Sequence, residues 1–178
     1  ASTNAVITNS TGAVTASNTA TTAQADTISA FATAVVYNVS GTAAEIVAAS
    51  AAARNEAVNI TISDGATIAQ ATTAEDASNS GTVTVATITD TAANIAASTN
   101  AVITNSTGAV TASNAATVAQ ATTIDAFAKA VVFAVSDTAA AIAASSSAAL
   151  DEATSVTASD TATVAQATTI DAFAKAVV

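Results

Sequence analysis

The chain has 178 residues, a formal net charge of -10, and no His, Cys, Met, Trp or Pro. Without His or Cys it lacks the commonest general base, the thiolate nucleophile and the usual ligands of zinc, copper and iron, so we expect neither enzyme activity nor a cofactor. Its three basic residues are too few for nucleic-acid binding, which needs clustered phosphate contacts. Because no run of about 18 bulky apolar residues occurs, we also expect no membrane span.

Composition places the chain near the border of disorder. Ala, Thr and Ser make up roughly three-fifths of the residues, a strong deviation from average usage. Large apolar side chains are scarce, as in segments that cannot bury enough apolar surface to fold. A folded structure therefore has to come from the pattern of residues, and a disordered, mucin-like spacer is the alternative if that pattern does not produce one.

The strongest pattern is internal repetition. Residues 4–18 (NAVITNSTGAVTASN) recur letter for letter at residues 100–114, and residues 116–132 recur at residues 162–178. The second offset is about 46 residues, and each such unit divides into two short repeats of about 23 residues, a period typical of solenoids. An insertion interrupts the series near residues 77–81. One polar or turn residue closes each short repeat: Asn18, Gly41, Asp64, Asp90, Asn114, Asp137 and Asp160.

A period-2 alternation of apolar and polar residues precedes each closing residue, and this alternation is typical of half-buried strands. Strands are predicted at residues 12–17, 35–40, 58–63, 83–89, 108–113, 131–136 and 154–159. Their inward positions form two core columns. The first column is Val14, Tyr37, Ile60, Ala86, Val110, Phe133 and Val156, and the second is Ala16, Val39, Ile62, Ile88, Ala112, Val135 and Ala158.

An Ala-rich run with a helix-start signal follows each closing residue. The signal is a T-x-x-Q/E capping box, in which the Thr hydroxyl accepts from one free amide and the third residue's side chain accepts from another. These pairs are Thr42 with Glu45, Thr67 with Gln70, Thr117 with Gln120, and Thr163 with Gln166. They predict helices of about 12 to 14 residues, a length that is marginal in isolation.

The short repeats predict an α/β-solenoid, in which one parallel sheet is backed by a layer of Ala-rich helices. About seven coils would form a single domain over residues 1–178. Neither end of the sequence carries a distinct polar cap. We therefore expect the chain to belong to a longer array, or to associate end to end through its terminal coils.

The outward strand positions carry hydroxyl side chains. On a parallel sheet they would form regular rows, roughly 4.8 Å apart between strands. Such an uncharged lattice suits a face that orders water or ice, although any solvated strand face also favours small β-branched polar residues. The candidate binding face comprises Thr15, Ser17, Thr61, Ser63, Thr87, Thr89, Thr111, Ser113, Thr157 and Ser159.

Four acidic residues, Asp64, Asp90, Asp137 and Asp160, occupy equivalent corners after the predicted strands. Stacked carboxylates could share a calcium ion. Asp between a strand and a helix is also the residue expected in a turn or a helix cap. We favour the cap, because Asn18, Gly41 and Asn114 interrupt the acidic series.

Two segments carry a family resemblance, residues 89–97 (TDTAANIAA) and 136–144 (SDTAAAIAA), with a weaker copy at residues 40–47. They resemble the DTAANIAA-type repeats of large secreted bacterial proteins, including cyanobacterial haemolysin-like and S-layer-like chains. The resemblance implies an α/β-solenoid and an extracellular or cell-surface location.

Together these features predict a non-catalytic structural protein: a repeat segment of a surface layer, fibre or adhesin that acts by stacking. Ice binding through the outward hydroxyls is the alternative function. The expected partners are further copies of the chain, with ice, a surface glycan or a partner cell as other candidates.

Overall fold

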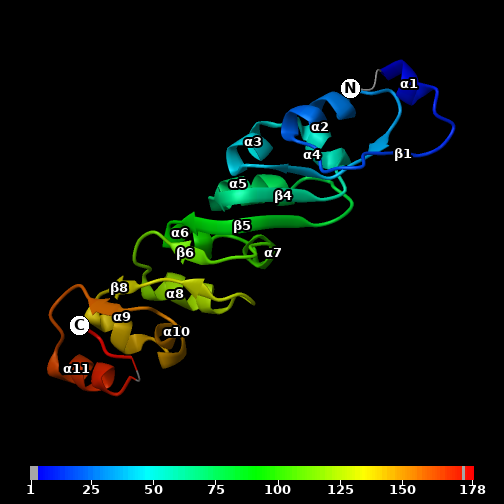
Figure 1. Cartoon of the computed structure of the whole chain (residues 1–178). Helices are drawn as coiled ribbons and strands as arrows, with labels where there is room; N and C mark the ends of the chain where they lie inside the picture. Colours follow the sequence, from blue (N-terminus) through cyan, green and yellow to red (C-terminus); the bar gives the residue numbers. More distant parts are fainter. Residues whose placement is uncertain (1–3, 174) are drawn as a thin grey trace. The chain divides into compact units, whose positions relative to one another are not determined.

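The computed structural model describes residues 4–173 and 175–178. The chain is an α/β protein of parallel strands and helices, as the sequence predicts (Figure 1). It forms two compact units, the first comprising Ala1–Thr87 with Asn105–Gly108, and the second comprising Ile88–Thr104 with Ala109–Val178. Strand β5 (Val83–Asp90) contributes its first part to unit 1 and its last part to unit 2.

Unit 1 contains two sets of paired strands and five helices. Strand β1 (Val14–Thr15) pairs in parallel with β2 (Val35–Val36), and β3 (Val39–Gly41) pairs in parallel with β4 (Ile60–Ala66), which is followed by β5 in the strand order. The helices of this unit are α1 (Asn4–Thr8), α2 (Thr22–Ser29), α3 (Ala43–Ala48), α4 (Ala51–Glu56) and α5 (Ile68–Glu75).

Unit 2 repeats this plan. Its strand order is β5, β6 (Val110–Ala112) and β7 (Val131–Val132), and β8 (Val135–Asp137) pairs in parallel with β9 (Val156–Ala158) in a separate sheet. The helices of this unit are α6 (Ala92–Ala96), α7 (Asn100–Thr104), α8 (Val118–Asp125), α9 (Ala139–Ala144), α10 (Ser147–Asp151) and α11 (Val164–Asp171). The described strands thus form one five-stranded sheet, β3 to β7, and two separate two-stranded sheets, where the sequence predicted one continuous sheet.

The four predicted capping boxes are confirmed. Each Thr accepts a hydrogen bond from the backbone amide three residues later, and the Glu or Gln at that position accepts one from the backbone amide of the Thr. A fifth box, not predicted, joins Thr21 to Gln24 at the start of α2.

The predicted helix length is wrong. Single helices of eight residues (α2, α5, α8 and α11) alternate with pairs of helices of five or six residues (α3 with α4, α6 with α7, α9 with α10). Ser50 explains the break in the first pair, because its hydroxyl accepts from the backbone amide of Ala53 at 3.1 Å and starts a new helix. Ser competes with the helix for backbone amides and so favours a cap over a helix interior.

The predicted core columns are buried along most of their length, but their register is wrong. Val39, and not Tyr37, pairs with Ile60, while Val135, and not Phe133, pairs with Val156. The reason is that a break divides the predicted strand 35–40 into β2 and β3.

The register in unit 2 is displaced in the same way. Ile88, and not Ala86, pairs with Val110, and Val110 then pairs with Val131. The predicted strand 131–136 is divided into β7 and β8, which lie in different sheets.

The predicted insertion near residues 77–81 forms the connection between α5 and β5. Asn79 donates through its side-chain amide to the carbonyl of Val58 at 3.1 Å. Gly81 lies so close to the same carbonyl that an added Cβ would be 2.5 Å from its oxygen. Glycine is therefore required where this connection crosses the neighbouring repeat.

Candidate functional site

The outward hydroxyl face is exposed in both units. Nine of the ten predicted residues are exposed and Thr111 is half-buried. Some face residues are aligned across strands: Ser40 pairs with Thr61 in unit 1, and in unit 2 Thr89 pairs with Thr111. A third such pair, Ser136 with Thr157, joins β8 to β9.

Equivalent outward positions of the predicted strands would place Thr15, Thr61, Thr87, Thr111 and Thr157 in one row, but Thr87 and Thr111 are not aligned. Thr111 lies beside Thr89, and Thr61 accepts a hydroxyl hydrogen bond from Thr84 at 3.3 Å. Thr87 instead lies close to Gly65 and Gly108. A Cβ added to Gly65 would be 3.2 Å from the Thr87 hydroxyl, and one added to Gly108 would be 3.0 Å from its methyl group.

Two exposed valines interrupt the hydroxyl rows. Val36 lies opposite Thr15, and Val132 lies opposite Thr111. Their side chains are 46% and 47% exposed, respectively. Among the described residues, the face therefore consists of short hydroxyl patches separated by apolar side chains.

The second outward row predicted from the sequence contains Ser17, Ser63, Thr89, Ser113 and Ser159 of the candidate face. Ser63 lies within β4, whereas Ser113 and Ser159 directly follow β6 and β9. Ser63 uses its hydroxyl to donate to the carbonyl of Gly41 at 3.1 Å. Ser113 and Ser159 donate through their backbone amides to the carbonyls of Asp90 and Asp137, each at 2.8 Å. Ser17 is exposed. The hydrogen bonds of Ser63, Ser113 and Ser159 add to the pairing between repeats.

Four of the corner residues join consecutive structural repeats, where a structural repeat is counted from a strand through the helix that follows it. In each case a side-chain oxygen accepts from the backbone amide of the first residue of a helix in the preceding repeat, one of the amides that a helix itself leaves without a partner. The pairs are Asp64 with Ala43 at 2.7 Å, Asn114 with Ala92 at 2.8 Å, Asp137 with Val118 at 2.9 Å, and Asp160 with Ala139 at 2.6 Å. We call this hydrogen bond the corner bond.

The carboxylates also bind amides of their own repeat. Asp137 accepts through its second oxygen from the amide of Thr138 at 2.8 Å. Asp90 accepts from the amide of Thr91 and from the side chain of Asn94, both at 2.7 Å. No group of three or more acidic side chains with metal-binding geometry occurs among the residues that the structure describes. The corner oxygens thus act as hydrogen-bond acceptors between and within repeats.

A second series of side-chain hydrogen bonds connects neighbouring repeats, and the sequence analysis did not predict it. Asn38 Oδ1 accepts from the backbone and side-chain amides of Asn59 at 3.2 and 2.9 Å, and Asn59 Oδ1 accepts from the amide of Thr82 at 2.8 Å. Asp26 similarly accepts from the amide of Ser50 at 2.9 Å. The recurrence of Asn and Asp about one period apart was the available sequence signal.

Hydrogen bonding stabilises two of the exposed carboxylates in their charged form. The backbone amide and then the hydroxyl of Thr42 lower the pKa of Glu45. For Asp26, the backbone amide of Ser50 is the main cause of the lowered pKa. Each of these carboxylates thus accepts a hydrogen bond from the residue that caps the start of a helix, Thr42 for α3 and Ser50 for α4.

The side chain of Arg54 forms hydrogen bonds with backbone carbonyls at the end of α3. Its guanidinium Nη1 donates to the carbonyls of Ile46 and Val47 at 3.2 and 3.1 Å, and also to that of Ala49. These carbonyls lie in or just beyond the last turn of α3, where a helix leaves its carbonyls unpaired. Arg54 therefore closes the end of α3.

Tyr37 is buried in unit 1 and donates its hydroxyl to the carbonyl of Ala53 at 2.8 Å. Burial is the main cause that raises its pKa to about 12, and the negative charges of Glu56 and Asp26 add to the shift. The equivalent residue of unit 2 is Phe133, which has no hydroxyl to donate.

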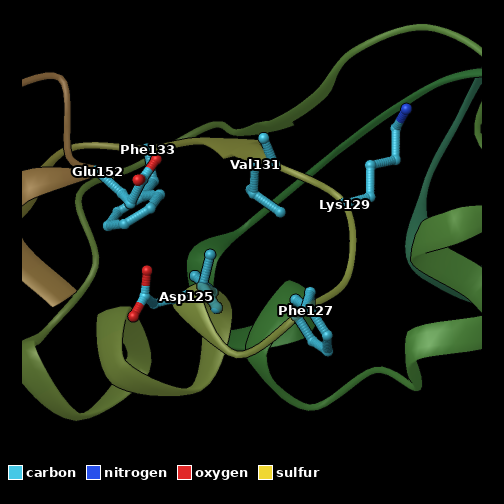
Figure 2. A pocket seen from close by; sticks show the side chains of 8 residues that line it. Asp125, Phe127, Lys129, Val131, Phe133 and Glu152 are labelled. Atoms are coloured by element: carbon cyan, nitrogen blue, oxygen red, sulfur yellow. The ribbon is translucent and has the colours of Figure 1, made fainter. Parts of the chain in front are cut away.

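A pocket of about 210 Å³ lies beside Phe133. Figure 2 shows the carboxylates of Asp125 and Glu152 on the Phe133 side of this pocket, with Lys129 extending away from them. Asp125 and Glu152 are both exposed. The lining residues contain no Ser or Thr that could act as a nucleophile beside these carboxylates.

Comparisons with protein-family models, curated proteins and solved structures find no match for this chain. Within the described residues, none of the helices has the length and apolar character needed to cross a membrane.

Replacing the carboxylate of a corner bond should reduce stability. We expect Asp160→Ala to lower the free energy of unfolding by about 1 kcal/mol, because the amide of Ala139 loses its acceptor. Asp160→Asn should retain most of the stability, since Asn114 makes the same bond. Urea unfolding measures both, with Asp151→Ala as a control for the lost charge. Equal losses in the Ala and Asn variants would contradict this role.

The titration of Tyr37 should report its burial. The unfolded Tyr ionises near pH 10, and the folded one near pH 12. In the folded state the hydroxyl therefore stays protonated to a higher pH. The stabilisation that the protonated Tyr37 provides is fully present below about pH 10 and is lost as the pH rises toward 12. Phenolate absorbance follows this group alone, because the chain has one Tyr and no Trp. A titration midpoint near pH 10 for Tyr37 in the folded protein would show that its hydroxyl is not buried.

Proposed function

We propose that the chain is an α/β-solenoid segment of a non-catalytic structural protein of the cell surface. In this role it forms part of a surface layer, fibre or adhesin, and it acts by stacking coil on coil and end to end. The corner bond is the observation that carries the proposal. It is present at Asp64, Asn114, Asp137 and Asp160, between residues 19 to 22 positions apart, and it connects these four helix starts to the following repeat.

The strand pairing supports the same proposal. The strand pairs β1–β2, β3–β4, β5–β6, β6–β7 and β8–β9 are all parallel. Their partner residues lie about one short repeat apart, as for Val39 with Ile60 and Val135 with Val156. Parallel neighbours at a constant offset are what stacked coils require. The scarcity of reactive side chains favours a structural role over a catalytic one.

End-to-end stacking predicts association that depends on concentration and salt. We expect the average mass from light scattering to rise with protein concentration. The rise should be stronger at high ionic strength, because salt screens the repulsion between chains that each carry a net charge of -10. A circular dichroism spectrum with helix and strand should accompany it, in contrast to a disordered spacer. A stable monomer under all these conditions would count against the proposal.

Ice binding is the second candidate, and the paired hydroxyls Thr89 and Thr111 favour it. Neighbouring parallel strands hold such groups roughly 4.8 Å apart. Against it stand the exposed side chains of Val36 and Val132, which divide the hydroxyl rows.

Thermal hysteresis tests the second candidate. If the face binds ice, the chain should depress the freezing point below the melting point, and Thr111→Tyr should abolish the effect by disrupting the flat face. Thr122→Tyr, on the exposed surface of α8, is the matched control and should leave the effect intact. The absence of hysteresis in the unaltered chain would exclude ice binding.

A further inference from the structure

Two helices of identical sequence differ in burial. Helices α8 and α11 both consist of the residues VAQATTID. In α8, Ala121 is 0% exposed and Ile124 is 2% exposed, whereas α11 contains no buried residue. Because the sequences match, the difference comes from what packs against each helix.

The helix contacts identify the side of α11 that is exposed. Helix α8 packs against α6, from the repeat before it, and against α10, from the repeat after it. Helix α11 packs against α9, which precedes it as α6 precedes α8. The burial that α11 lacks therefore corresponds to the side of α8 that α10 covers. In unit 1, α4 covers α2 in the same arrangement.

Helix α1 differs from its own duplicate in a complementary way. Helices α1 and α7 both consist of the residues NAVIT. Val102 of α7 is 2% exposed, whereas its equivalent in α1, Val6, is 65% exposed. Helix α7 is the second helix of its pair, as α4 and α10 are of theirs, and α4 and α10 cover the eight-residue helices α2 and α8. By its place in the repeat, α1 therefore corresponds to the helices that provide this cover.

We propose that α1 of one copy of this chain packs on α11 of another copy, in the position that α10 occupies on α8. This inference rests on the proposed function and specifies the contact between neighbouring copies, which we call the α1–α11 joint. The groove beside α11 has a volume of about 410 Å³ and is lined in part by Ala167, Ile170, Phe173 and Val177. Helix α1 is a suitable occupant because it carries no charged residue. The repelling charges of the two copies therefore lie outside α1.

The contact is heterologous, since it joins two different surfaces. Each copy that binds through α1 still presents its own α11, so the contact repeats without closing and produces a linear assembly. A symmetric contact, α1 with α1 or α11 with α11, would stop at a dimer.

Two charge substitutions test the joint by sedimentation velocity of the full chain. We expect Val6→Asp and Ala167→Asp each to weaken self-association by at least about tenfold, because each would bury an unpaired charge. Both residues are exposed in the unassociated chain, so the folded monomer should tolerate the changes. The matched controls are Val36→Asp and Ala165→Asp. Both positions are exposed, as are their duplicates Val132 and Ala119, and these variants should associate normally.

Mixing the two variants gives the decisive result. Val6→Asp retains an intact α11 and Ala167→Asp retains an intact α1, so an equimolar mixture should form one-to-one heterodimers and nothing larger. Association of the unaltered chain that neither substitution weakens, or a mixture that stays monomeric, would overturn the α1–α11 joint while leaving end-to-end stacking in place. A monomeric unaltered chain would overturn both.

Discussion

The corner bond is the interaction on which the rest of the structure depends. The helices are five to eight residues long, well below the roughly 12 to 15 residues that an isolated helix needs for marginal stability in water. Most helices begin with a Thr or Ser that caps them. At four helices, a side chain from the following repeat also accepts a hydrogen bond from the backbone amide of the first helical residue. Helix formation in one repeat is thereby coupled to the placement of the next repeat, which makes the repeats cooperative.

Hydrogen bonds between repeats matter for this fold because many of its buried side chains are small. Ala25, Ala74, Ala92 and Ala121 are fully buried, and each contributes much less apolar area than Leu or Ile would. Ala brings the helices close to one another and to the strands, but the hydrophobic stabilisation per residue is low. Orientation and register then rely on hydrogen bonds. Among the described residues, no buried side-chain nitrogen or oxygen lacks a hydrogen-bond partner.

Local features of the fold could be predicted from the sequence, whereas features between repeats could not. The Thr67 and Thr117 capping boxes depend on residues three apart, so the pattern alone located the helix starts. The two-residue register error at Val39 arose because an alternating stretch does not reveal where a strand breaks. The role of Asp64 depends on an amide 21 residues earlier in the sequence, and no local signal distinguishes it from a cap of its own helix.

The duplicated segments separate what the sequence determines locally from what neighbours determine. Helix α11 has the same bounds within the repeat as α8, and its capping box between Thr163 and Gln166 has the same geometry as that between Thr117 and Gln120. Its helix therefore forms without cover on the side that α10 occupies on α8. Binding costs less when the interacting surface is already ordered. The surface that α11 presents is formed in advance, so a helix that docks there adds burial without having to induce the structure that receives it.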